Sequence, residues 1–186
     1  MRVSSFRVIG AAILAFAPVM EALADGKGRV QVTGGFGYVA AEGDLPGIGT
    51  GGLGELQYSL PSLDWLRFYA GGIWATRNRR SCGDDIKCDV SASLFFTGAK
   101  LRMTAPIPYA RPFVDIGLGL SAGTLTVQSG PSHNNHTSGI MLHVPIAFGV
   151  QFGRQFVMDV GGLFMAHPGT NGNVGAMLAI GAGFGI

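Results

Sequence analysis

Apolar and polar residues alternate along three segments of the chain, which is the pattern of a β-strand with two different faces. In residues 113–123 the even-numbered residues are apolar, and the odd-numbered residues are three glycines with Phe113, Asp115 and Ser121. Residues 140–152 and 174–186 repeat this pattern. Five further strands are expected at about residues 28–40, 50–60, 66–76, 90–102 and 156–167, which makes eight.

Two details of this pattern need the structure to resolve them. Between residues 90 and 102 the alternation is ambiguous, because Leu94 and Phe96 oppose Phe95 and Leu101. Pro145 lies inside the second segment, and proline normally sits at an edge strand or a bulge because it has no N–H to donate.

The composition places these strands in a membrane. Only 13% of the residues are charged and 31 of 186 are glycine, whereas soluble domains have about 25% charged residues. After Ala24 no apolar run approaches the roughly 20 residues of a spanning helix. Because only helices and closed barrels cross a bilayer, we predict an all-β fold, an eight-stranded antiparallel up-and-down transmembrane β-barrel.

Residues 1–24 have the composition of a secretory signal peptide. Arg2 and Arg7 precede an apolar stretch, residues 8–20. Ala22-Leu23-Ala24 then forms a small-x-small cleavage site. A retained anchor is the alternative, but the stretch is short for one and contains Pro18. We therefore expect cleavage before Asp25 and a barrel over residues 25–186.

The segments between the expected strands are alternately short and long. Short turns are expected at 61–65, 104–111 and 153–155, and longer polar loops at 41–49, 77–89, 128–138 and 168–173. Outer-membrane barrels have short periplasmic turns and longer external loops. Both termini are therefore expected on the periplasmic side, with the four long loops outside the cell.

With this leader, these strands and the segment "RPFVDIGLGLSAG" after a proline-containing turn, residues 27 to 186 resemble the OmpA/OmpX-type family of eight-stranded outer-membrane barrels. The glycine-rich final strand, which carries Phe184, is also similar. The resemblance implies insertion by the barrel assembly machinery and contact with outer-membrane lipid and lipopolysaccharide. It also implies a structural or surface-interaction role through the external loops, and the sequence does not identify the external ligand.

Eight strands enclose a space that side chains fill, or that holds one small ligand. Buried charges need partners, so inward-facing ionic residues should form a polar network. A proton or narrow water path through the same groups is the alternative. Gln57, Gln151 and His167 are also expected to face inward. The predicted network consists of Glu55, Arg67, Asp115, His143 and Asp159.

The expected loop at 77–89 contains both cysteines of the chain. In an exported protein, Cys82 and Cys88 most simply form a disulfide; free thiols and a metal site are the alternatives. Arg77, Arg79 and Arg80 lie in the same loop. Arginine binds phosphate well, so these three are candidates for lipopolysaccharide contact, although charged runs are commonly solvated.

The remaining histidines and the overall charge give no support for metal binding or nucleic-acid binding. His133 and His136 are expected in the loop at 128–138, where no further ligand completes a metal site. We expect neither a metal nor another cofactor. A formal net charge of +2 gives no reason to expect nucleic-acid binding.

Two alternative functions remain. The segment "GLFMAHPGTNGNVG" is somewhat similar to the histidine-bearing strand of the outer-membrane lipid A deacylases, through His167 and Asn171. The serine of that family falls on Gly169, next to Thr170, and no carboxylate follows Asp159, so we expect no enzyme activity. A secreted lipocalin-like binder would have an apolar cavity and a polar exterior, which is the reverse of the pattern here.

Overall fold

The computed structural model describes residues 28–40, 48–77, 80–81, 87–129, 133–153, 156–168 and 174–185. Within these ranges the side chains are described for residues 28–39, 49–76, 90–126, 137–153 and 157–168. The predicted signal peptide lies outside the described residues, so its cleavage stays a prediction.

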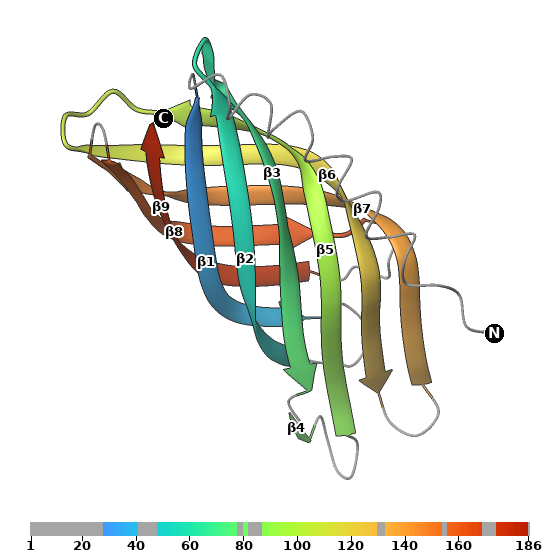
Figure 1. Cartoon of the computed structure of the whole chain (residues 1–186). Helices are drawn as coiled ribbons and strands as arrows, with labels where there is room; N and C mark the ends of the chain where they lie inside the picture. The colour runs from blue at the N-terminus through green and yellow to red at the C-terminus, as the bar shows by residue number, and fades with distance from the viewer. Residues whose placement is uncertain are drawn as a thin grey trace.

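Antiparallel strands form one closed ring (Figure 1). Each of eight strands pairs with its neighbours along the chain, and the first pairs with the last to close the ring. The predicted eight-stranded up-and-down barrel is therefore confirmed. A ninth, two-residue strand, β4, pairs only with β5 beside the ring. The strands are β1 (Arg29–Ala40), β2 (Ile48–Leu60), β3 (Leu63–Arg77), β4 (Arg80–Ser81), β5 (Lys87–Thr104), β6 (Ala110–Ser129), β7 (His133–Phe152), β8 (Phe156–Ala166) and β9 (Val174–Gly185).

We call the two ends of the barrel the inner end and the outer end. At the inner end β1 begins and β9 ends, since Arg29 pairs with Gly185. The turn between β2 and β3 at this end is only residues 61–62, and the turn between β5 and β6 is residues 105–109. The outer end holds the connections from β1 to β2, β3 to β5, β6 to β7 and β8 to β9.

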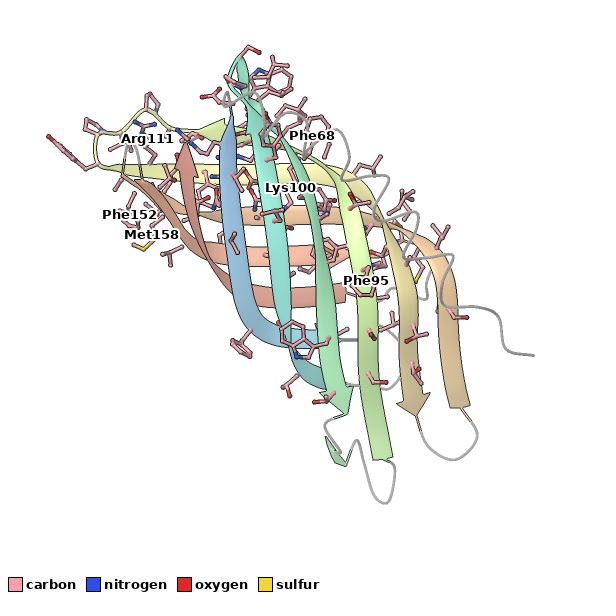
Figure 2. All side chains as sticks on the ribbon, in the orientation of Figure 1. Phe68, Phe95, Lys100, Arg111, Phe152 and Met158 are labelled. Atoms are coloured by element: carbon pink, nitrogen blue, oxygen red, sulfur yellow. The ribbon has the colours of Figure 1, made fainter. Side chains whose placement is uncertain are left out.

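Successive residues of each strand point to opposite sides of the barrel wall. On β6, Val114 and Leu118 are 43% and 58% exposed, whereas Asp115 is 1% exposed. The same alternation of exposed and buried residues assigns the two faces of β5. Phe95 faces outward and Lys100 faces the interior (Figure 2). Apolar side chains on the outer surface are what a bilayer requires.

The outward apolar residues form a band of the height of a bilayer core. On β3, the outward residues alternate with buried ones from Leu66 to Trp74, and Trp74 is about half exposed. The separation of eight residues between Leu66 and Trp74 corresponds to about 20 Å along the membrane normal, for about 3.3 Å per residue and a tilt near 40°. Tryptophan is typical of a membrane interface, so Trp74 marks the outer limit of this band. Among the described residues, no helix has the length and hydropathy needed to span a bilayer.

Strands β5, β6 and β7 are longer than their sequence pattern predicted. They contain 18, 20 and 20 residues, whereas β1, β8 and β9 contain 11 or 12. The predicted loop at 128–138 is therefore wrong, because only residues 130–132 connect β6 to β7. His133 and His136 belong to β7, opposite Ser129 and Thr126. The apolar alternation ends where the outward residues become polar, although the backbone pairing continues.

Pro145 lies in a strand that is paired on both sides. It is opposite Met165 of β8. On the other side, the ladder with β6 omits Gly117 and Leu118 and then continues in the same register. The missing N–H thus interrupts one ladder without a bulge, and the expectation of an edge or a bulge is wrong.

The barrel interior has two layers of different chemistry. The inner half contains the buried ionic and amide side chains, whereas the outer half is apolar. The apolar layer consists of Val39, Leu53, Ile73, Ala75, Val90, Ala92, Leu94, Phe96, Leu125, Met141, Leu163 and Met165.

Candidate functional site

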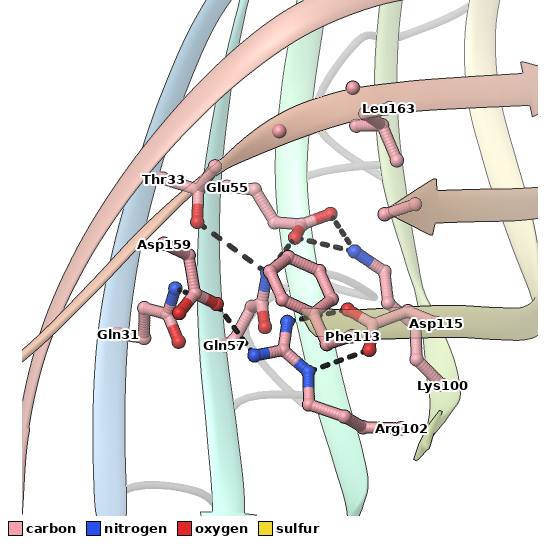
Figure 3. Close-up of a pocket in the computed structure, with 13 residues that line it drawn as sticks. Gln31, Thr33, Glu55, Gln57, Lys100, Arg102, Phe113, Asp115, Asp159 and Leu163 are labelled. Carbon is pink, nitrogen blue, oxygen red and sulfur yellow. Dashed lines mark hydrogen bonds and ion pairs between the residues drawn. The ribbon is translucent and has the colours of Figure 1, made fainter. Parts of the chain in front are cut away.

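Two groups of ion pairs occupy the inner half of the barrel (Figure 3). Lys100 Nζ lies 2.6 and 2.7 Å from the two carboxylate oxygens of Glu55. Arg102 donates two hydrogen bonds to Asp115, of 2.6 and 2.7 Å, and a third of 2.6 Å to Asp159. All five residues are at most 6% exposed. Bidentate arginine–carboxylate pairs are strong and fix the orientation of both partners.

Neutral side chains complete the hydrogen bonding of the carboxylates. Gln31 and Gln151 donate to Asp159 at 2.8 and 3.1 Å. Gln57 donates to Glu55 at 2.6 Å. A cavity of about 30 Å³ remains between these groups, which is space for one or two water molecules. The charges are therefore enclosed and individually paired, as buried ions require.

Arg67 is less well paired than the other cations. Its Nη1 donates to the amide oxygens of Gln31 and Gln57 at 2.9 and 3.2 Å. Its one ion pair in the described structure is to Asp159, at 3.8 Å. Arg67 was expected to pair with Glu55, Asp115 or Asp159, but Lys100 and Arg102 hold these carboxylates more closely.

Lys100 and Arg102 are the network residues that the sequence reasoning missed. Both lie on β5, the strand whose faces the pattern did not assign. Lys100 and Arg102 lie an even number of residues from Leu94 and Phe96, so all four point to the same side of β5. Leu94 and Phe96 are 4% and 3% exposed, and assigning these two to the interior would have placed the two cations there as well. Two basic residues at positions i and i+2 on one strand also point to the same side of the wall.

A chain of four side chains joins the two layers of the interior. Tyr69 Oη lies 2.6 Å from His143 Nε2. His143 Nδ1 lies 2.9 Å from Ser121 Oγ, which is 3.1 Å from His167 Nε2. The exposed fractions of these four side chains are between 0% and 5%. On the inner side, Lys100 Nζ lies 4.5 Å from the centre of the Tyr69 ring, so the chain begins beside the ionic network.

One set of proton positions satisfies this chain. Tyr69 O–H donates to His143 Nε2, His143 Nδ1–H donates to Ser121 Oγ, and Ser121 O–H donates to His167 Nε2. In the reverse direction the Tyr69 hydrogen has no acceptor among the described residues. We therefore assign the Nδ1–H tautomer to neutral His143.

Several predicted site residues cannot be compared with the structure. Cys82 and Arg79 lie outside the described residues, and the side chains of Cys88, Arg77 and Arg80 are not described. The disulfide and the lipopolysaccharide contact stay predictions. Where residues are described, no group of three or more histidine, cysteine or acidic residues is placed to hold a metal.

The possible deacylase residues do not meet in the described structure. His167 is 5% exposed and faces the interior, where it contacts Ser121 rather than the lipid-facing surface. Gly169, Thr170 and Asn171 lie outside the described residues. The Ser121–His167 pair lies inside the barrel, where a lipid ester in the bilayer does not reach it, because Ser121 is fully buried.

Comparisons with known proteins agree with the architecture. A family model described as outer membrane protein beta-barrel domain matches residues 9–185. The Neisserial surface protein A structure is similar with a TM-score of 0.56 and 13% identity, over 86% of this chain and 97% of that one. Ail, the attachment invasion locus protein of Yersinia pestis, is similar with a TM-score of 0.50 and 16% identity, over 85% and 98%. A search of curated protein sequences found no significant match.

Proposed function

Since the chain belongs to the family of outer membrane protein β-barrel domains, we propose that it acts at the cell surface by presenting a projecting β-sheet to an external partner. The outer membrane is its location. The two similar solved structures are named as a surface protein and an attachment protein, and the proposal extends that kind of role to this chain.

The unequal lengths of the strands carry this proposal. The outward apolar residues of β6 and β7 end near Ala122 and Ile140, and the next outward residues, Thr124 and Ser138, are polar and exposed. About six more residues of each strand stay paired beyond that level, up to Ser129 and His133. At about 3.4 Å per residue this is a projection of roughly 20 Å. Figure 1 shows the outer parts of β5, β6 and β7 side by side, with the end of β3 next to β5.

One edge of the projecting sheet is unpaired. The ladder between β7 and β8 ends with Val144 opposite Ala166. Residues 133–143 of β7 therefore have no strand partner on that side among the described residues. An unpaired strand edge offers a row of backbone donors and acceptors to which an extended segment of another protein can add. Lipopolysaccharide contact through Arg77, Arg79 and Arg80 belongs to the same proposal.

Passage of solutes is not part of this function. The apolar outer layer and the paired charges of the inner layer support a lumen filled by side chains, as the width of an eight-stranded barrel favours. We expect no stable open channel when the purified protein is added to a planar lipid bilayer. We also expect no enzymatic role, so the acyl pattern of lipid A should be the same in cells with and without the gene; a loss of one acyl chain would contradict this.

The direct test shortens the projecting hairpin. Leu125 and Thr137 are opposite each other, so residues 126–136 can be replaced by Asn-Gly, which forms a two-residue hairpin turn. Bacteria that display this variant should lose binding to cultured epithelial cells, while the protein still migrates as a folded barrel on an unheated gel. The matched control shortens residues 41–47, which connect β1 to β2 at the same end, and should bind normally. Unchanged binding by the hairpin variant would contradict the proposal.

A further inference from the structure

Two arginines and a serine lie side by side at the inner end of the barrel. Arg29 of β1 is opposite Ser59 of β2, and Ser59 is opposite Arg67 of β3. Neighbouring strands are about 4.8 Å apart, so the backbones of the two arginines are separated by roughly 10 Å. Ser59 and Arg67 are 5% and 3% exposed. Three hydrogen-bonding side chains thus occupy one side of the inner mouth.

Both arginines have a buried donor that lacks an acceptor. The Nε atoms of Arg29 and Arg67 are buried and make no hydrogen bond. No ion pair or hydrogen bond of the Arg29 side chain occurs within the described structure. A buried polar hydrogen without an acceptor is unfavourable, and more so when the group is charged. The unpaired donors therefore indicate that an acceptor belongs at this place.

Among the described inward-facing ionic groups of the inner half, cations outnumber carboxylates: Arg29, Arg67, Lys100 and Arg102 against Glu55, Asp115 and Asp159. Among fully buried groups the three carboxylates are already held by Lys100 and Arg102, and Arg67 approaches only Asp159, at 3.8 Å. Arg29 adds a further cation beside them. The charges of Arg102 and Arg29 repel that of Arg67, whereas Asp115 and Asp159 attract it. An anion at this position would accept from both guanidinium groups and offset the excess charge.

We propose that Arg29, Ser59 and Arg67 bind a small oxyanion of the phosphate or sulfate class at the inner mouth of the barrel. The planar guanidinium fork matches the oxygens of such an anion, and the Ser59 hydroxyl supplies a further donor. The closed wall of strands separates the site from membrane lipid, so the anion enters from the aqueous periplasmic side. This site lies at the opposite end from the projecting sheet and is independent of the surface role.

The test measures whether phosphate stabilises the folded barrel. A ligand that binds only the folded state raises the unfolding temperature as its concentration increases. Thermal unfolding of the full-length barrel, refolded in detergent micelles, is followed by circular dichroism in increasing inorganic phosphate or sulfate. Sodium chloride of equal ionic strength is the reference. We expect a saturable rise in the unfolding temperature with either oxyanion and none with chloride.

Variants assign the effect to the proposed residues. Arg29→Gln should weaken phosphate binding about tenfold or more, since a charge-assisted hydrogen bond contributes about 1.5–3 kcal/mol. Arg29 has no other partner in the described structure, so this variant should fold. Arg67→Gln should have the same effect, and Arg111→Gln is the control, because it removes an equal charge from another strand at the same end. Equal unfolding temperatures in phosphate and chloride, or full binding by Arg29→Gln, would overturn the proposal.

Discussion

The two halves of the barrel interior are both filled by side chains, but these side chains are ionic in the inner half and apolar in the outer half. In the inner half, Lys100 and Arg102 are paired with carboxylates at 2.6 Å. In the outer half, residues such as Leu94 and Leu125 of the same strands pack without polar atoms. Strands β5 and β6 pass through both halves, so one strand changes its inward chemistry along its length.

The difference shows which half depends on specific partners. An apolar layer is stabilised by volume and contact area, and it tolerates exchanges of similar size. A buried ionic layer needs every charge to keep its partner, because a charge left alone retains the full desolvation penalty. We therefore expect single substitutions to be more damaging in the inner half, and matched double substitutions to be tolerated there.

The largest effect is expected from Arg102→Met. This change leaves Asp115 and Asp159 without their shared cation, and breaking a buried pair costs about 3–5 kcal/mol. The free energy of unfolding in urea, measured in detergent or lipid vesicles, should fall by that amount. The paired variant Glu55→Gln with Lys100→Met removes both charges and should cost much less than either single change. A double variant as unstable as the sum of the singles would contradict the view that pairing controls this half.

Leu125→Ala tests the apolar half. Leu125 is 2% exposed, and truncation of a buried leucine costs about 2–5 kcal/mol, depending on how far the cavity collapses. Leu125→Met keeps the volume and should cost less than about 1.5 kcal/mol. The same urea titration compares the two. If methionine were as damaging as alanine, the outer layer would depend on shape as strictly as the inner layer depends on charge.

Gly119→Ala tests the boundary between the halves. A Cβ atom there would lie 2.4 Å from Tyr69 Oη and from the Thr97 carbonyl oxygen, and 2.6 Å from His143 Cε1. Crowding of this kind costs about 1–3 kcal/mol. Gly54→Ala is the matched control on the outer surface, where nothing lies within 4 Å. It should leave the unfolding free energy unchanged or raise it slightly, and an equal loss in both variants would argue against close packing at the boundary.

The smallest effect is expected from Tyr69→Phe. The ring and its contact with Lys100 remain, but His143 Nε2 loses the hydroxyl that donates to it. One net hydrogen bond is worth about 1 kcal/mol. Nuclear magnetic resonance of the His143 ring nitrogens in the labelled protein should show a changed tautomer balance as well. A variant with unchanged stability and unchanged nitrogen shifts would remove Tyr69 from the chain.

The membrane-embedded parts of the strands could be predicted from the sequence because lipid imposes a strict rule on alternate residues. Val114 to Leu120 and Ile140 to Phe152 follow that rule. Outside the bilayer the rule no longer applies, so the extensions of β6 to Ser129 and of β7 from His133 had no apolar signature. Pairing between the two strands, which depends on backbone hydrogen bonds, continues regardless of the side chains.

The partners within the interior could not be predicted in the same way. The sequence indicated that Glu55, Arg67 and Asp115 face inward, but Lys100 and Arg102 lay on the strand with ambiguous faces. Which cation meets which carboxylate depends on the stagger between neighbouring strands, and a shift by one residue would turn every side chain to the other face. The register of β5 with β6, Arg102 opposite Asp115, selects that pair.

The sequence alone predicted that this chain spans the outer membrane as eight strands, because low charge, the lack of a 20-residue apolar run after Ala24 and two-residue alternation favour a closed barrel. Tertiary structure decided the rest. Barrel closure brings Asp159 of β8 to Arg102 of β5 at 2.6 Å, and His167 to Ser121 at 3.1 Å, although these residues are far apart in the chain. The physical reason is that alternation fixes the face of a residue, whereas its partner is fixed by the register and the closure of the ring.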